Sequence, residues 1–320
     1  HLPKGSTTSS SEVPSSGAAR ALLMRVYLQR AGYSLNRETV KLTRPDDNTR
    51  SVYFNAVIDE WEAFQSENYH GFYNEGYEQL FKNYSQLILN NQESLWEIAF
   101  EPNQGETDNA GTWATYNGPI VAAPGEYPGT SNYMGRDNAF FLVLPYWKTF
   151  YETNDDGTPK DQRRDVNFVD YAYVWNASTE TQNKTYTNSA IRNNAYRYPG
   201  KWRREWMALG FVDPNNTGVT PITNANYNSL LKAPKVYNLA FISDADDTGK
   251  FRTALYWERA FELCYEGQRK YDLLRWGILG DALRTAQEYL ESWQPNEDDN
   301  INMAKWNPKT WASSNYVAGH

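Results

Sequence analysis

The sequence predicts a mainly helical protein that carries long irregular insertions and a few short strands. Two observations indicate this fold class. Apolar residues recur at helical spacing in several segments, of which the longest runs from Phe251 to Gly277. Between those segments lie stretches rich in Gly, Pro and Asn that follow neither a helical nor a strand period, above all Glu101–Asn138. We therefore expect helices that pack through one apolar stripe and are joined by long organised loops.

The N-terminal third predicts three helices after a polar lead-in. His1–Ser16 is rich in Ser, Thr and Pro and is expected to be flexible. Helical periodicity then covers Ala18–Ala31, Val52–Asn68 and Tyr77–Leu89. The second of these helices carries an apolar stripe formed by Phe54, Val57, Ile58, Trp61 and Phe64.

The middle of the chain is weakly patterned. Alternating residues predict short strands at Ser94–Phe100 and Val169–Trp175. Asp155-Asp156-Gly157 and Asp213–Gly218 predict turns. No period is visible from Thr220 to Gly249.

Towards the C-terminus, the pattern predicts an amphipathic helix that is continuous or nearly so from about Phe251 to Leu274, with charged residues opposite an apolar arc. Trp257, Phe261 and Cys264 lie on that arc and are expected to be buried. A shorter helix is predicted at Ala282–Trp293.

Two glycines have expected roles around this helix. Gly267 falls inside the apolar arc, where a missing side chain would let another helix approach closely. Gly277 lies where a helix C-terminal cap belongs.

The order of residues in this helix is more specific than its period. From Arg259 to Gly277 the chain reads Arg-Ala-x-Glu-Leu-x-x-Glu-Gly-x-Arg-x-x-Asp-Leu-x-Arg-Trp-Gly. This run resembles the C-terminal signature of the SusD/RagB family, the surface glycan-capturing lipoproteins of Bacteroidetes outer membranes. Gly17–Gly32, Tyr77–Phe100 and Asp161–Phe168 also resemble segments of that family. The signature residues are Glu258, Arg259, Glu262, Glu266, Gly267, Arg269, Asp272, Arg275 and Trp276.

The resemblance implies a SusD-like fold, in which tetratricopeptide-like helical pairs carry long irregular insertions and a few short strands. It also implies a protein on the cell surface, lipid-anchored in the outer membrane, that serves nutrient uptake and polysaccharide utilisation. Such a protein binds an oligosaccharide or polysaccharide and delivers it to a SusC-like TonB-dependent transporter. It performs no chemistry, so no catalytic residue, metal or cofactor is expected.

The chain also departs from the family pattern. Between Thr220 and Gly249 it lacks the apolar helix with an Arg-Tyr-Ala-Asp pattern that the family carries. A closing Pro-Ile-Pro segment, the first N-terminal helices, a signal peptide and a lipidation Cys are missing too. We therefore expect a fragment.

The expected organisation follows from these departures. Residues 1–16 form the lead-in, and residues 17–320 form a single SusD/RagB-like domain that is incomplete at both ends. The chain either joins ordered pieces of a longer protein or is an abridged natural member. A junction is expected within 208–244, with Tyr227–Asn228 as the first choice.

Composition excludes several classes of partner and site. The 320 residues carry a net charge of −8 without a basic block, which argues against nucleic acid and anionic lipid as partners. The longest mostly apolar stretches, Ala21–Leu28, which Arg25 interrupts, and Ala139–Leu144, are too short to span a bilayer. Cys264 is the only cysteine, so no disulfide framework is expected.

No arrangement of residues predicts catalysis. Of the three His residues two are terminal, and His70 is expected in a surface loop. Glu258, Glu262 and Glu266 share a helix face, but cations interleave with them. Those cations favour ionised carboxylates and disfavour the general acid that a glycosidase needs.

Two other functional classes stay open at this stage. A surface glycoside hydrolase would need two facing carboxyls, one of them with a raised pKa. A helical-repeat scaffold that binds peptides would need a concave groove. A calcium site built from backbone carbonyls also stays open, although two EF-hand-like starts fail because Arg163 and Leu255 occupy their twelfth positions.

The segment Glu101–Trp147 supplies the candidate ligand-binding residues. Sugars present apolar C–H faces and rings of hydroxyls, which flat aromatic side chains and amides can bind. We expect the segment to fold over the helical body and to present several rings at one surface concavity. The candidates are Trp113, Tyr116, Tyr133, Trp147 and Asn117.

Overall fold

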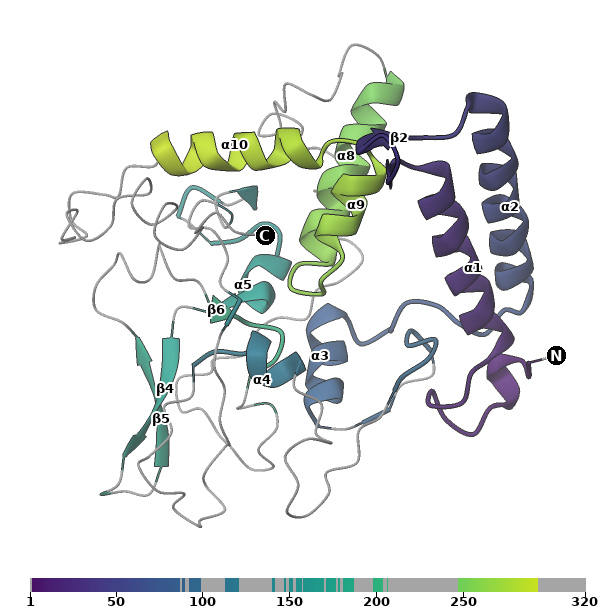
Figure 1. Cartoon of the computed structure of the whole chain (residues 1–320). Helices are drawn as coiled ribbons and strands as arrows, with labels where there is room; N and C mark the ends of the chain where they lie inside the picture. Colours follow the sequence, from purple (N-terminus) through teal and green to yellow (C-terminus); the bar gives the residue numbers. More distant parts are fainter. Residues whose placement is uncertain are drawn as a thin grey trace. The chain divides into compact units, whose positions relative to one another are not determined.

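The computed structural model describes residues 2–86, 88–89, 92–98, 113–120, 140–141, 147, 150–151, 154–156, 158–169, 171–176, 178, 181–186, 198–203, 206 and 247–292. These residues are mainly helical with a few short strands, which confirms the predicted fold class (Figure 1). Backbone contacts divide the chain into two compact units, residues 1–111 with 266–280 and residues 112–265 with 281–320. The single domain expected over 17–320 stays a prediction. The expected junction within 208–244 lies outside the described residues.

The first unit is built on an antiparallel pair of helices, α1 (Ser16–Ala31) and α2 (Asp47–Ser66). The Ser15 hydroxyl accepts a hydrogen bond from the Ala18 amide, and the Asp46 carboxylate accepts one from the Thr49 amide. These side chains satisfy amides that have no partner inside the helix. The Asp46 cap explains why α2 begins five residues before the predicted Val52.

The connection between these helices contains a hairpin that the sequence pattern did not predict. Strands β1 (Ser34–Asn36) and β2 (Lys41–Thr43) pair antiparallel, with Leu35 opposite Leu42. The Asn36 side chain accepts hydrogen bonds from the amides of Glu38 and Thr39, which closes the turn. Strands of three residues are too short to show a period.

Close packing at the other end of the pair involves glycine. Gly17 of α1 and Gly5 of a 3-10 turn, Gly5–Thr7, both lie against the imidazole of His70. A Cβ at Gly5 would lie 2.4 Å from His70 Nε2, and one at Gly17 would lie 2.7 Å from Cδ2. The ring of His70 also stacks on Phe64 at 5.7 Å between centroids. Part of the segment expected to be a flexible lead-in therefore packs onto the helical pair.

The next helix, α3 (Tyr77–Ser85), is shorter than predicted. It begins after Gly76, which has a φ of 95°, and it buries Tyr77, Leu80 and Phe81. Burial raises the pKa of the Tyr84 phenol to about 12, despite a hydrogen bond with Ser94 that lowers it.

The strand predicted from Ser94 is wrong for residues 94–98, which form no strand ladder. The amide of Glu97 donates to Ser11 O, and the indole of Trp96 donates to Glu12 O at 3.3 Å. These separate hydrogen bonds pair donors of the segment without a partner strand. An alternating sequence pattern alone does not supply a partner strand.

The continuous helix predicted from Phe251 to Leu274 is also wrong. The structure contains α8 (Asp247–Glu262) and a separate α9 (Arg269–Arg275). Tyr265 and Gly267 between them have φ values of 64° and 73°, in the left-handed region that cannot continue an α-helix. Gly267 is exposed, so its expected packing against another helix is wrong as well. The residue instead permits the turn.

Helix α9 ends in the predicted cap. The amide of Gly277 donates to Leu274 O at 2.9 Å, and the amide of Ile278 donates to Leu273 O at 3.0 Å. With a φ of 79° at Gly277, these two bonds form a Schellman motif. A Cβ at Gly277 would lie 2.6 Å from the ring of Tyr33, whose amide donates to Arg275 O.

The second unit contains α8, the short helix α5 (Arg163–Asn167) and two antiparallel strand pairs. Strand β4 (Tyr171–Asn176) pairs with β5 (Thr181–Tyr186), and β3 (Phe168–Val169) pairs with β6 (Tyr198–Pro199). The predicted strand Val169–Trp175 thus divides between β3 and β4. Helix α10 (Leu279–Ser292) begins three residues before the predicted Ala282.

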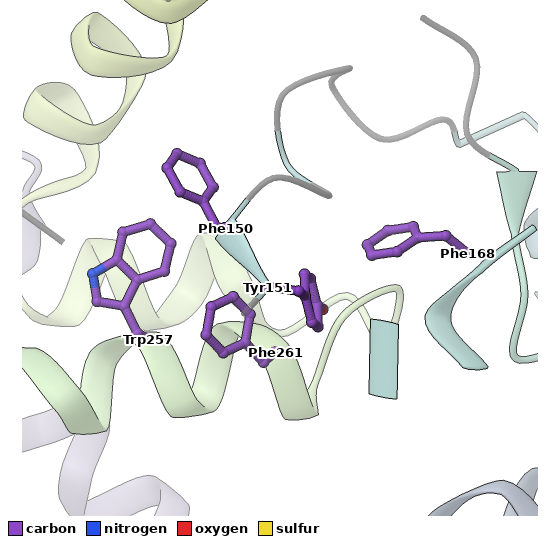
Figure 2. Close-up of a cluster of buried hydrophobic side chains, with 5 residues drawn as sticks. All are labelled: Phe150, Tyr151, Phe168, Trp257 and Phe261. Carbon is purple, nitrogen blue, oxygen red and sulfur yellow. The ribbon is translucent and has the colours of Figure 1, made fainter. Parts of the chain in front are cut away.

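Aromatic rings form the main buried cluster of this unit, as Figure 2 shows. Trp257 and Phe261 of α8 are buried, as predicted, and contact each other at 5.7 Å between ring centroids. Tyr151 packs against Phe261 at 4.5 Å and edge-on against Phe168. Cys264 is only partly buried at the edge of the cluster. Burial raises the pKa of the Tyr151 phenol, which accepts a hydrogen bond from Asn167.

We predict that Gly277→Ala will destabilise the first unit by roughly 1–3 kcal/mol, because an L-residue is strained at positive φ and its Cβ would collide with Tyr33. Urea unfolding would measure the change. Gly280→Ala is the matched control, since Gly280 lies exposed within α10 and gains helix propensity from alanine. Equal effects of the two substitutions would contradict the assigned cap.

Candidate ligand-binding surface

Helix α4 (Trp113–Asn117) carries three of the five candidate ligand-binding residues. The ring of Trp113 is exposed, with 48% of its surface accessible, and Tyr116 is partly exposed. These two residues are three positions apart, so a helical turn brings them to neighbouring places. Asn117 is only 2% exposed, and its amide donates to Trp113 O at 3.0 Å. Asn117 therefore holds the helical turn that carries the two rings.

Two further aromatic residues join this surface. The ring of Phe140 stacks on Tyr116 at 5.0 Å between centroids with an interplanar angle of 26°. The Phe140 amide donates to Tyr116 O at 2.8 Å, which fixes the pair through the backbone. Phe140 and Phe141 are 64% and 54% exposed. We name Trp113, Tyr116, Phe140 and Phe141 the α4 aromatic surface.

The strand pair behind α4 supports this surface. The chain leaves α4 through Gly118, Pro119 and Ile120, and the amide of Tyr173 in β4 donates to Ile120 O at 2.8 Å. Ile120 packs on a buried cluster of Val169, Tyr171, Tyr173 and Tyr198. The exposed rings are therefore attached to a packed scaffold, which lowers the entropic cost of ligand binding.

Of the other two candidates, only Trp147 lies among the described residues. Trp147 packs into the main aromatic cluster, where its ring stacks on Trp257 at 5.7 Å and meets Phe150 edge-on at 5.6 Å. Its contacts are those of a core residue. Tyr133 lies outside the described residues, as does most of Glu101–Asn138.

A second group of polar residues was a candidate for chemistry: the carboxylates of α8. Arg163 lies at the start of α5 and is 1% exposed. Its Nη1 donates to Glu258 Oε1 at 2.6 Å and to Glu262 Oε2 at 2.8 Å. Its Nε and Nη2 each donate to Asp161 at 3.0 Å. One guanidinium is thus shared by three carboxylates, a group that we name the Arg163 cluster.

The electrostatics of this cluster indicate a structural role. Burial alone lowers the pKa of Arg163, but the hydrogen bonds and charges of Glu258 and Asp161 outweigh burial and raise it. Lys201, also buried, donates from Nζ to Glu262 O at 2.8 Å. The carboxylates of the cluster thus accept charge-assisted hydrogen bonds from a buried cation, as in a structural ion-pair network.

The remaining signature residues also make structural contacts. Asp272 is buried and accepts a hydrogen bond from Arg275 Nε at 3.0 Å. The guanidinium groups of Arg269 and Arg275 lie 5.9 and 4.9 Å from the ring centroid of Trp276. The signature therefore specifies packing. Sequence reasoning noted both Asp161–Phe168 and the α8 glutamates, but nothing in either pattern indicated that Arg163 would bind them.

Other sites were tested among the described residues. No group of three or more His, Cys, Asp or Glu side chains is placed there to hold a metal ion. Asp155 and Asp156 lie in the predicted turn, where Asp156 Oδ1 accepts from the amide and hydroxyl of Thr158. Within the same part of the chain, no helix combines the length and apolar character required to cross a bilayer.

Comparisons with known proteins agree on one family. Residues 218–317 match the model of the SusD family. A SusD-like protein P25 from Formosa agariphila is 30% identical over 166 residues, which are 52% of this chain and 24% of that protein. A crystal structure of a SusD homologue from Bacteroides thetaiotaomicron superposes with a TM-score of 0.60 at 21% identity. That superposition covers 92% of this chain and 60% of the solved chain, so both relatives are longer than the part matched here.

We predict that Arg163→Met will destabilise the second unit by roughly 3–5 kcal/mol, because three carboxylates would lose their shared cation. Denaturant unfolding would measure the loss. Arg284→Met is the control: Arg284 pairs with Asp281 at the surface, so its removal should change stability by no more than about 0.5 kcal/mol. An Arg163 variant as stable as the control would contradict the structural role of the cluster.

Proposed function

We propose, because the chain belongs to the SusD/RagB family, that it is a cell-surface glycan-binding protein. It captures oligosaccharides and delivers them to a SusC-like TonB-dependent transporter of the outer membrane. In the full-length protein an N-terminal lipid anchor holds it to that membrane. The family supports this role in general, and the residues of this chain support the capture step.

The α4 aromatic surface is the observation that carries the proposal. Four exposed or partly exposed rings lie on one helix and one short segment, and two of them are fixed by stacking. A monomer folded for stability alone gains nothing by leaving Trp113 and Phe140 in water. When the aliphatic face of a sugar stacks on such a ring, the exposed apolar surface of the ring is buried. The sugar hydroxyls stay solvated.

Magnitudes favour capture with modest affinity per site. An aromatic contact contributes about 0.5–1.5 kcal/mol beyond burial of its area. Two or three rings then give weak binding to one short oligosaccharide. A polymeric glycan that meets many receptors on one cell surface raises the effective concentration, so weak sites suffice.

The same structure supports binding without chemistry. The best-placed carboxylates of the described residues, Asp161, Glu258 and Glu262, are all engaged with Arg163. The hydrolase alternative needs a carboxyl that donates a proton to a leaving sugar, and this arrangement disfavours it. No cofactor is part of the proposal.

We predict that Trp113→Ala will weaken glycan binding about tenfold or less and leave the melting temperature within a few degrees, because the ring is exposed. Affinity electrophoresis against a panel of soluble polysaccharides would identify a ligand, and calorimetry with its oligosaccharides would give the affinities. No reducing sugar should appear over long incubation. Turnover that one Asp or Glu substitution abolishes would instead assign a hydrolase.

Trp147→Ala is the matched control for this experiment. Trp147 packs in the aromatic cluster, so alanine there should cost roughly 3–5 kcal/mol of stability. If Trp113→Ala unfolds the protein as Trp147→Ala does, or leaves glycan affinity unchanged, the α4 aromatic surface is not the binding site.

A further inference from the structure

One end of the α1–α2 pair is cationic in a chain that is acidic as a whole. Between Arg25 and Arg50 the sequence holds six cations and three carboxylates, whereas the whole chain has a net charge of −8. Arg44 and Arg50 share Asp47 at 3.0 and 3.1 Å. Arg25 donates to the side-chain oxygen of Gln268 at 2.8 Å. The cations in this region thus differ in the protein side chains that they already bind.

Arg30 is held in place without an anionic partner. Its Nε donates to the Tyr53 hydroxyl at 3.0 Å, and its guanidinium carbon lies 5.1 Å from the Tyr53 ring centroid. Tyr53 in turn stacks on Tyr27 of α1 at 6.3 Å. Arg30 is exposed, and no carboxylate lies within ion-pair distance of it among the described residues.

This geometry leaves the terminal nitrogens of the Arg30 guanidinium available for a ligand. The stack and the Nε hydrogen bond fix the guanidinium plane, while the terminal nitrogens Nη1 and Nη2 form no described bond. A planar fork that is ordered before binding can donate two parallel hydrogen bonds to a carboxylate or sulfate at low entropic cost. Lysine or a mobile arginine would not offer this.

We propose that Arg30, supported by Tyr53 and Tyr27, recognises the anionic groups of an acidic glycan, either a uronic acid carboxylate or a sulfate ester. The proposal rests on the proposed glycan-binding function and assigns a separate site for acidic glycans to the first unit. The α4 aromatic surface carries no charge of its own and would bind sugar rings whether or not they are acidic.

Two other roles of Arg30 make different predictions. Arg30 lies in the last turn of α1, where a cation favours the helix dipole, so a purely structural role would appear as lost stability. An anionic membrane surface attracts clusters of cations by net charge, without need of one fixed fork. A role in membrane attraction would therefore not depend on Arg30 more than on Arg25.

Calorimetry on the full 320-residue chain tests the proposal with three hexasaccharides. Chondroitin 6-sulfate carries sulfate and carboxylate, its desulfated form carries carboxylate alone, and maltohexaose is neutral. We expect an acidic hexasaccharide to bind more tightly than maltohexaose. Arg30→Ala should weaken that binding about tenfold, and Arg30→Lys should weaken it nearly as much because the fork is lost. If the Arg30 variants weaken binding of the sulfated probe only, the group that Arg30 recognises is sulfate. If they weaken binding of both acidic probes, it is carboxylate.

The controls separate this site from the rest of the molecule. Arg25→Ala removes the same charge from the same helix and should change affinity for the acidic probes less than twofold. Arg30→Ala should keep its melting temperature within a few degrees and bind maltohexaose as the wild type does. Trp113→Ala tests the proposed function separately, because the α4 aromatic surface should bind neutral glycans without Arg30.

Three results would overturn the proposal. The acidic hexasaccharides could bind no better than maltohexaose, while Trp113→Ala still weakens glycan binding. Arg25→Ala and Arg30→Ala could weaken binding equally, which would mean that only net charge acts. Arg30→Ala could leave the glycans unaffected but abolish binding to phosphatidylglycerol vesicles, which would make this end a membrane-contacting surface.

Discussion

The packing of α5 against α8 in the second unit depends on the buried guanidinium of Arg163. Arg163 comes from the segment before β3, and Glu258 and Glu262 come from α8, about a hundred residues later in the chain. Desolvating a guanidinium is costly, and the cost is offset only when several oxygens surround it in good geometry. Asp161, Glu258 and Glu262 supply those oxygens. Asn167 of α5 also donates to Phe261 O. This hydrogen bond and the Arg163 cluster together position α5 and β3 on α8.

The chain uses its irregular positions to divide one apparent helix into two. Left-handed residues at Tyr265 and Gly267 end the turn after α8, and Gly277 ends α9. Near the end of α9, the backbone oxygen of Arg275 accepts a hydrogen bond from the amide of Tyr33. The signature therefore encodes a helix, a turn, a second helix and a cap. Its residues shape the fold.

Some of this was predictable from particular residues. The helices α1 and α2, the burial of Trp257 and Phe261 and the cap at Gly277 follow from local rules. The predicted apolar stripe of α2 is not a buried face, because Phe54, Ile58 and Trp61 are exposed. The break at Tyr265 was not predictable, because tyrosine carries no turn signal and the helical period continues through it. Trp147 and Trp113 look alike in sequence, yet one packs on Trp257 and the other faces solvent. Only tertiary contacts distinguish them.

If the carboxylates of α8 hold the fold while exposed rings bind the glycan, then stability and glycan affinity depend on different residues. Glu258→Gln tests it most directly, because this change removes one charge from the Arg163 cluster and alters no ring. Unfolding and glycan binding would be measured on the same preparation. The account predicts a lower unfolding free energy and a glycan affinity within twofold of the wild type. A variant that unfolds like the wild type but no longer binds or cleaves glycan would contradict it.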